Sequence, residues 1–392
     1  MVEENKIRVS EISSHLQKGK IRFECRYYAG YKPCGISEFC DGCGGFEPCG
    51  MRILIIKLAA LGDVLRTTPI LPALKGHYLQ SHIVWLTDPD AIPLLQNNSY
   101  IDALYGFDTG GALCVTSIPF DVAINFEKEE RALALFDAIR AKEKRGFAYS
   151  TAGTLSIAND ASLYALQMGL HDELKFRLNK ETYQETTFKM AEIPYHREEY
   201  VFHLSGRAED FACDTAKKLN LSSGRFHVGL NTGCGTVFET KQWTVNGFCD
   251  LASALAHDGD CDLLLLGGSR ECEFNQAVLK KCGTILKDTG CNNSLEEFAG
   301  IISLCDVVVS SDSLAAHLAI ALKKHVAIFF GPTCSQEVDL YGRGVKIETD
   351  FPCAPCYLKT CSRLPNCMEN MDAKRIYDAV RSCLNDIKLS RM

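Results

Sequence analysis

An acidic residue at the end of an apolar run is the first candidate for chemistry. Asp63 follows the strand-like run 53–56, the small-residue turn 59–61 and Gly62. A carboxylate at the start of a helix serves as an N-cap by accepting a backbone N–H. If it faces a crevice at the carboxyl ends of parallel strands, it is also placed to take a proton from a hydroxyl group. The position thus allows an N-cap or a general base.

A lysine follows a second strand-like run. Lys241 comes after run 226–230 and a loop that contains Thr232, Gly233 and Thr236. Backbone N–H groups of such loops bind phosphate, and a nearby lysine adds a compact positive charge for a diphosphate leaving group. The alternative is a surface lysine beside a packed tryptophan. The loop lacks GxGxxG spacing, so a dinucleotide fingerprint is not indicated.

Two further segments join strands to helices. Asp312 and Ser313 fall where N-cap residues belong, and the same helix start is an anion site. Gly267 and Gly268 end another strand, and an acid just beyond them, Glu271 or Glu273, could accept ribose hydroxyls. The alternative there is a solvated helix start rich in acids.

Twenty cysteines are the unusual feature of the composition. Scattered single cysteines are typical of buried small hydrophobes. Two groups have spacings that could hold tetrahedral zinc or an iron–sulfur cluster. Reduced thiols or a disulfide are the alternative for each group. The groups are Cys25, Cys34, Cys40, Cys43 and Cys49, and Cys353, Cys356, Cys361 and Cys367. We predict that at least one group binds metal structurally, with the N-terminal group favoured for iron–sulfur.

The elements that must position these residues alternate between strand and helix. Strands are expected at 52–57, 82–86, 103–107, 121–125 and 145–147, and again at 226–230, 262–266, 307–310 and 326–330. Helices are expected at 131–141, 246–257, 271–281, 294–304, 313–322 and 371–387. This alternation predicts two doubly wound parallel-sheet domains. The polar stretch 180–225 is interpreted as a linker or hinge.

The predicted organisation is therefore α/β with three parts. Residues 1–50 form a cysteine-rich, loop-rich extension, 51–200 a first Rossmann-like domain, and 201–392 a second one with a C-terminal cysteine motif and helix. Two such domains facing a cleft describe the GT-B architecture of glycosyltransferases. Other nucleotide enzymes share this layout, so the site must decide the function.

Bulk properties exclude some classes. With 46% apolar and 23% charged residues, the chain is typical of globular proteins, and its net charge of −7 does not favour nucleic acid as a partner. No apolar run has the length of a membrane span, and the start lacks an apolar signal core. We expect a cytoplasmic protein.

The run 51–75 resembles the N-terminal signature of the ADP-heptose:lipopolysaccharide heptosyltransferases, glycosyltransferase family nine. Lys57, Leu61-Gly62-Asp63 and Thr68-Pro69 fill its positions. Segment 310–322, followed by Phe330-Gly331-Pro332-Thr333, resembles the family's second signature. Leu314 stands where the family has glycine, and Thr244 where it has proline after Lys-x-Trp.

The resemblance implies roles for individual residues. Asp63, beside Gly62, would be the general base, and Lys241 would lie at the donor diphosphate. The nucleotide-sugar would be held by Thr232, Gly233, Thr236, Gly267, Gly268, Glu273, Asp312, Ser313 and His317. From its place on a helix alone, His317 would be interpreted as structural.

The function so implied is inverting transfer of a sugar from a nucleotide donor, with ADP-heptose favoured. The acceptor would be a lipopolysaccharide-core or related glycan or glycolipid, bound by the first domain at the inner membrane face. No cofactor is expected for transfer. Alternatives are a transferase of the same fold that uses another sugar nucleotide for protein or surface glycan, and a metal- or redox-binding module without transferase activity.

Overall fold

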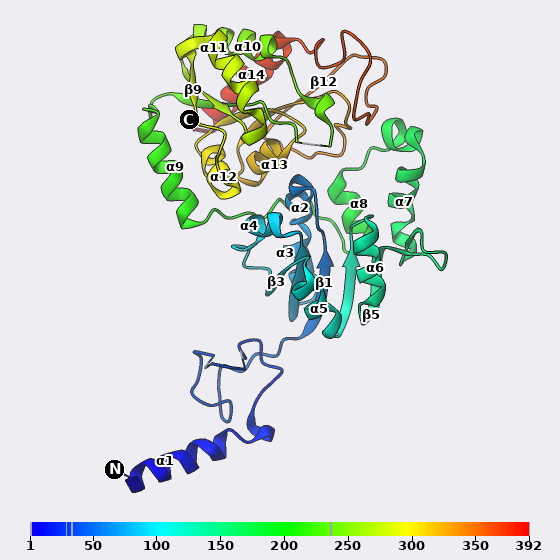
Figure 1. Cartoon of the computed structure of the whole chain (residues 1–392), viewed down its shortest axis with the longest axis vertical. Coiled ribbons are helices and arrows are strands. Elements are labelled where there is room, and N and C mark those ends of the chain that lie inside the picture. The colour runs from blue at the N-terminus through cyan, green and yellow to red at the C-terminus, as the bar shows by residue number, and fades with distance from the viewer. Residues whose placement is uncertain (1, 29, 33, 236, 392) are drawn as a thin grey trace.

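The computed structural model describes residues 2–28, 30–32, 34–235 and 237–391, with side chains from residue 8 onward. It contains two six-stranded sheets in two stacked domains (Figure 1). An N-terminal segment extends away from the first domain, and the helices α2 and α13 lie where the two domains meet.

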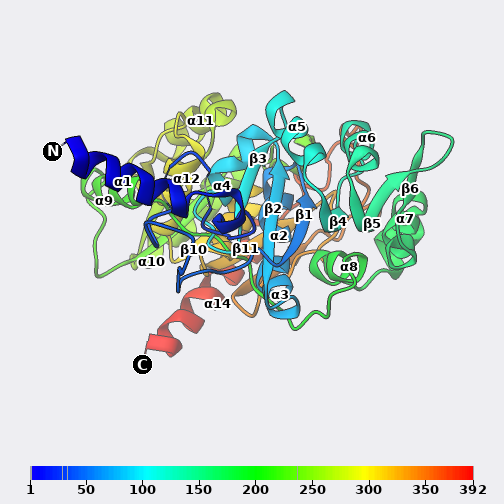
Figure 2. The same cartoon turned by 90° about the horizontal axis from the view of Figure 1, so that it is seen from below.

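The first sheet has the strand order β3-β2-β1-β4-β5-β6, which Figure 2 shows from below. Its strands are β1 (Met51–Ile56), β2 (Ser81–Thr87), β3 (Ala103–Gly106), β4 (Phe120–Asn125), β5 (Ala141–Tyr149) and β6 (Leu155–Ile157). All pairs are parallel except β5 with β6. The helices are α2 (Leu61–Thr67), α3 (Ile70–His77), α4 (Ile92–Leu95), α5 (Thr109–Ser117), α6 (Glu130–Ala138), α7 (Leu163–Leu170) and α8 (Tyr183–Met190), with a π-helical turn at Leu174–Leu178.

The second sheet repeats this order, β12-β11-β10-β7-β8-β9, and the strand pairs in it are parallel. Its strands are β7 (Phe226–Asn231), β8 (Cys261–Leu266), β9 (Leu286–Asp288), β10 (Val307–Ser311), β11 (His325–Phe330) and β12 (Gly344–Glu348). Its helices are α9 (Gly206–Lys218), α10 (Val245–Asp258), α11 (Cys272–Cys282), α12 (Leu295–Ser303), α13 (Leu314–Ala321) and α14 (Ala373–Arg391). Two Rossmann-like domains are thus confirmed.

Burial explains why the central strands form. The four residues of run 53–56 are fully buried, since β1 pairs with β2 on one side and with β4 on the other. A strand covered on both faces needs apolar side chains at every position rather than at alternate ones. The carboxyl end of β1 therefore lies at the centre of its sheet edge, where such folds bind ligands.

The two domains share one apolar cluster. Buried residues of the first domain, such as Leu65 and Phe188, belong to the same cluster as Ala315 and Leu318 of α13. This continuity fixes α2 against α13 and places the carboxyl ends of the strands of each domain toward the other.

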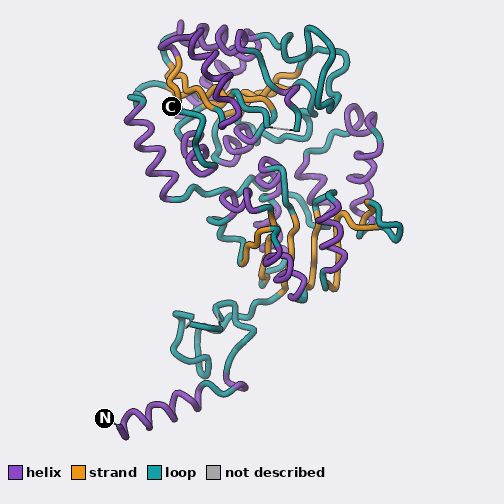
Figure 3. The backbone as a smooth tube through the Cα atoms, viewed as in Figure 1, coloured by secondary structure: helices purple, strands orange, loops and turns teal. Residues whose placement is uncertain are grey.

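Two sequence interpretations need correction. The loop-rich segment 1–50 begins with a helix, α1 (Val2–His15), although the described residues between 21 and 50 are almost entirely loop (Figure 3). The stretch 180–225, interpreted as a linker, contains α8 and α9. α8 buries Phe188 and Met190 in the shared cluster, so tertiary packing makes this helix part of the first domain.

That residues 1–50 are a separate module stays a prediction.

Within the described ranges, the helices are all too short or too polar to cross a bilayer.

Candidate active site

The predicted general base lines a cavity at the carboxyl end of β1. This acceptor-side cavity, as we call it, has a volume of about 290 Å³ and is lined by Asp63, Arg66, Lys128, Lys175 and, from the second domain, Glu337. The Asp63 side chain keeps 37% of its surface exposed. Its carboxylate can therefore meet a substrate hydroxyl group inside the cavity.

Two cations hold the Asp63 carboxylate in its charged form. Arg66, one helical turn further along α2, places Nε 3.0 Å from Oδ1, and Lys57 places Nζ 4.0 Å from Oδ2. Burial alone would raise the pKa of Asp63, but Arg66 and Lys57 outweigh that effect and hold the pKa below its ordinary value. Asp63 is therefore an ionised proton acceptor at neutral pH.

Lys57 is itself fixed by a buried carboxylate. Glu127 accepts a hydrogen bond from Lys57 Nζ at 2.5 Å and from the backbone N–H of Leu58 at 2.8 Å and of Ala59 at 3.1 Å. Burial opposes the charge of Lys57, yet the groups around it, Glu127 and Asp63 among them, raise its pKa. Glu127 thus shapes the turn between β1 and α2 and sets the distance from Lys57 to Asp63.

Most other charges around this cavity are paired. Lys175 lies 3.9 Å from Glu337, whose carboxylate is also 4.0 Å from Arg66. Among the described residues no carboxylate pairs with Lys128, whose Nζ lies 3.4 Å from the Ala165 carbonyl oxygen. Burial, and then repulsion from Lys175, lower the pKa of Lys128. This ammonium would gain from an anionic group in the cavity.

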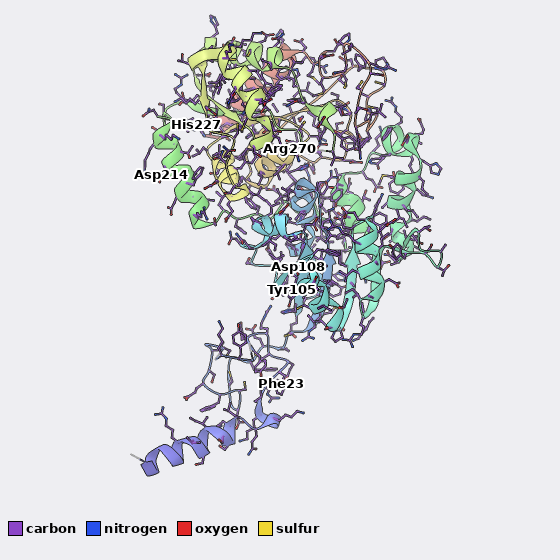
Figure 4. All side chains as sticks on the ribbon, viewed as in Figure 1. Phe23, Tyr105, Asp108, Asp214, His227 and Arg270 are labelled. Atoms are coloured by element: carbon purple, nitrogen blue, oxygen red, sulfur yellow. The ribbon has the colours of Figure 1, made fainter. Side chains whose placement is uncertain are left out.

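A second cavity, here called the donor-side cavity, lies at the carboxyl ends of the second sheet. Its volume is about 340 Å³, and it is lined by the predicted residues Gly233, Gly267, Gly268 and Ser313, together with Leu61 of the first domain. Arg270, labelled in Figure 4, also lines it, as do Glu271, Asn293 and Phe298. The sequence segments assigned to nucleotide binding therefore meet at one place.

Hydrogen bonds hold the turn between β10 and α13 in that cavity. Asn231 Nδ2 donates to Ser310 Oγ at 3.0 Å and to Ser313 Oγ at 3.2 Å. Lys241 Nζ donates to the backbone carbonyl of Asp312 at 2.5 Å. The lysine assigned to the diphosphate thus lies against the helix start assigned to the same group, although the two are far apart in sequence.

His317 lies between the domains. Its Nδ1 is 3.2 Å from the hydroxyl of Tyr200, and its Nε2 is 3.5 Å from Asp312 Oδ1. The side chain is 4% exposed, and it lines neither cavity described above. Burial would raise the pKa of Asp312, but hydrogen bonding to His317 and the charge of Lys241 lower it. His317 therefore stabilises the charged form of Asp312 without lining either cavity.

Two nucleotide assignments look different in the structure, and a third cannot be placed. Glu273 is exposed and lies outside the donor-side cavity, whereas Glu271 lines it. The Thr232 side chain is buried, with its hydroxyl 2.6 Å from Asn275 Oδ1 and 3.1 Å from the Leu266 carbonyl oxygen. Thr236 lies outside the described residues.

Several site residues were missed from the sequence. Arg66 could have been found from its spacing of three from Asp63 on a helix. Glu127 follows the end of β4, next to β1, so the rule on carboxyl ends of parallel strands points to it. Glu337 and Tyr183 have no local signal: the packing of the second domain brings Glu337 to Arg66, and the packing of α8 within the first domain places the Tyr183 ring 3.9 Å from the Arg66 guanidinium.

The two cysteine groups are arranged differently. Cys25, Cys34, Cys40 and Cys43 line one cavity of about 390 Å³ in the N-terminal segment, where Figure 4 labels Phe23. In the C-terminal group, burial and then the neighbouring Cys356, Cys353 and Cys361 raise the pKa of Cys367 to about 11. Among the described residues, no three His, Cys, Asp or Glu side chains are grouped to hold a metal ion.

The fold is a two-domain α/β architecture with cavities at the carboxyl ends of both sheets, as in enzymes that bind nucleotides. The sequence profile of glycosyltransferase family 9 (heptosyltransferase) matches residues 115–366, and the chain belongs to this family. It is a glycosyltransferase.

Known proteins resemble this chain in sequence and in fold. Lipooligosaccharide heptosyltransferase 2 of Campylobacter jejuni (serotype O:6, strain 81116) is 21% identical over 340 residues, covering 84% of this chain and 98% of the relative. The crystal structure of a family 9 glycosyltransferase from Veillonella parvula superposes with a TM-score of 0.69 at 18% identity, covering 87% of this chain and 99% of that one. The ADP-heptose lps heptosyltransferase II of Escherichia coli gives a TM-score of 0.62 at 16% identity, covering 86% and 100%.

The close approach of Gly62 in α2 to His317 in α13 can be tested by substitution. A Cβ atom added at Gly62 would lie 2.6 Å from Cδ2 of the buried His317 ring. Gly62→Ala should therefore push α2 away from α13 and lower the free energy of unfolding by about 1–3 kcal/mol, as overpacking does. Thermal and denaturant unfolding measure this.

Gly76→Ala, in α3, is the matched control, because nothing lies within 4 Å of its added Cβ. Equal stability of the Gly62 and Gly76 variants would contradict a tight contact at α2.

Proposed function

We propose that this protein transfers a heptose, with inversion, from ADP-heptose to a lipopolysaccharide-core or related glycan acceptor. The observation that carries the proposal is the charged Asp63, held by Arg66 and Lys57 in a cavity that adjoins the domain junction. Family membership and the names of the relatives support the donor and the acceptor class.

The acceptor-side cavity would hold the hydroxyl that reacts. The acceptor oxygen attacks the anomeric carbon of the donor as the bond from that carbon to the diphosphate oxygen breaks, and Asp63 takes the hydroxyl proton. Arg66 keeps Asp63 ionised and oriented for this step. The uncompensated charge of Lys128 favours an acceptor that carries an anionic group.

The donor-side cavity would hold the nucleotide. Gly233, Gly267 and Gly268 leave room for it, and Glu271 is placed to accept from the ribose hydroxyls in the role first assigned to Glu273. Lys241 and the start of α13 would stabilise the negative charge that develops on the departing diphosphate. With these groups, transfer needs no cofactor in this scheme.

The choice of donor sugar and the location of the enzyme in the cell are also proposals. A donor other than ADP-heptose, used for protein or surface glycan, would fit the same two cavities. We place the enzyme in the cytoplasm and at the inner membrane face, where a glycolipid acceptor would be reached by a protein in whose described part no membrane-spanning helix is found.

The general base is tested by Asp63→Asn. This variant should bind ADP as the parent does and lose turnover by about 100-fold or more, because the amide cannot accept the proton. Arg66→Met should shift the acid limb of the kcat/KM profile to higher pH, because loss of the cation raises the pKa of Asp63. Near-normal turnover of Asp63→Asn would show that Asp63 is not the general base and acts only at the start of the helix.

The donor is tested by melting temperatures with ADP, UDP and GDP. ADP should stabilise the protein most, because a ligand that binds only the folded state raises its stability.

Lys241→Ala should weaken ADP binding more than adenosine binding, as measured by calorimetry, because the charge of Lys241 faces the phosphates. Equal losses for both ligands would refute the role of Lys241, and a preference for UDP or GDP would refute the proposed donor.

We also propose that at least one cysteine group binds zinc or an iron–sulfur cluster as a structural element. The four-cysteine spacing and the raised pKa of Cys367, to which Cys356, Cys353 and Cys361 contribute after burial, support the C-terminal group, and the shared cavity supports the N-terminal one. Because metal thiolates stabilise folding strongly, stripping the metal should lower the melting temperature. Metal analysis and visible spectra of anaerobic protein test this.

The scattered cysteines provide a control. Replacing the exposed Cys114 and Cys213 by serine should leave the metal content unchanged. Substoichiometric zinc and iron, with every thiol of both groups titratable in the native protein, would contradict the proposal.

A further inference from the structure

One tyrosine in the C-terminal cysteine loop touches both halves of the site. Tyr357 follows Cys356, and the backbone N–H groups of these two residues donate to the Pro332 carbonyl at 2.9 Å and 3.0 Å. The loop is thereby pinned to the turn after β11. In Figure 1 this loop lies on the same side of the molecule as the segment that follows α7.

The ring of Tyr357 packs on the first domain. It stacks on Phe176 with centroids 5.3 Å apart and an interplanar angle of 4°, and Lys175 Nζ lies 3.8 Å from its centroid. Lys175 lines the acceptor-side cavity. Tyr357 therefore holds one wall of that cavity from the second domain.

The hydroxyl of Tyr357 is linked to Asp63 through Glu337 and Arg66. It donates to Glu337 Oε2 at 3.2 Å and accepts from the backbone N–H of Cys334 at 3.3 Å. The same Glu337 carboxylate lies 4.0 Å from Arg66, and Arg66 lies 3.0 Å from Asp63. Tyr357 thus limits how far Glu337 can draw Arg66 away from the base.

On its other side the loop meets the segment that carries Lys241. The edge of Phe238 faces the Tyr357 ring at 5.6 Å, and Thr240 Oγ1 donates to the Leu358 carbonyl at 2.8 Å. Lys241 Nζ lies 5.9 Å from the Phe238 ring centroid, but its hydrogen bond goes to the Asp312 carbonyl and does not involve Tyr357. Loss of the Tyr357 ring should therefore disturb the acceptor side more than the donor side.

We infer that Tyr357 is a positioning residue for the acceptor: its ring fixes the wall formed by Lys175 and Phe176, and its hydroxyl restrains Glu337. This inference rests on the proposed function for the identity of the acceptor-side cavity. It also gives the cysteine loop a role in the site, because the loop fixes the tyrosine at the junction of the domains.

Tyr357→Ala tests the ring. With ADP-heptose as donor and heptose-free lipopolysaccharide as acceptor, the KM for acceptor should rise about tenfold, since a stacked pair and a cation–π contact are lost together. The calorimetric Kd for ADP should change less than twofold. Phe176→Ala should have a similar effect, and the double variant should be little worse than either single one, because both remove the same contact.

Tyr357→Phe tests the hydroxyl. It should keep the parent's acceptor KM but move the acid limb of kcat/KM to higher pH, because a freed Glu337 draws Arg66 away from Asp63. Tyr377→Phe is the matched control, since that hydroxyl bonds to Asp258, away from both cavities, and its pH profile should not move. An unchanged acid limb in Tyr357→Phe would overturn the role of the hydroxyl.

Hydrogen exchange separates this inference from the proposed function, because it needs neither donor nor acceptor. Backbone amides of residues 174–178 should exchange several-fold faster in Tyr357→Ala, while those of α14 stay as in the parent. Unchanged exchange at 174–178 would overturn the inference, as would equal rises in the KM values for donor and acceptor. If instead Asp63→Asn retained turnover, the proposed function would fail while the contact tested by exchange would stand.

Discussion

The close contact between α2 and α13 is the constraint on which the site depends. Gly62 lets the ring of His317 approach the start of α2, so that the carboxyl end of β1 in one domain faces that of β10 in the other. Asp63 and Asp312 then stand close enough for their charges to interact. A side chain at position 62 would separate two half-sites, each of which is incomplete without the other.

Charge compensation follows from that contact. Buried carboxylates are costly unless cations or hydrogen bonds hold them. Here each carboxylate has its own support: Arg66 and Lys57 for Asp63, Lys241 and His317 for Asp312, and the β1–α2 turn for Glu127. The result is a row of ionised groups beside Lys128, an ammonium that no carboxylate pairs with among the residues that the structure describes. In the proposed mechanism, such a preorganised arrangement would stabilise charge that develops during transfer without reorganising.

Much of the fold could be predicted from the sequence, because β1, β8, β10 and β11 are apolar runs bounded by turns and need no distant partner to be recognised. The segment 180–225 could not, since α8 is polar on average and is stabilised by burying Phe188 and Met190 against other elements. Within the site, Asp63, Lys241 and Asp312 stand next to strand ends and carry local signals. Glu271 and Glu273 have equal local signals, and only the three-dimensional path of the short turn at Ser269–Glu271 decides which faces the cavity.

The sequence by itself determined the two-domain α/β class, the family, and the segments to which we assign the proposed base and phosphate-binding groups. Strand and helix periodicity and short motifs are local properties, so they survive without coordinates. Only the tertiary structure decided the distant partners of those groups: Glu337 beside Arg66, Tyr200 on His317, and Tyr357 across the domain junction. These pairs join residues far apart in the chain, and their distances depend on how two separately folded sheets pack together.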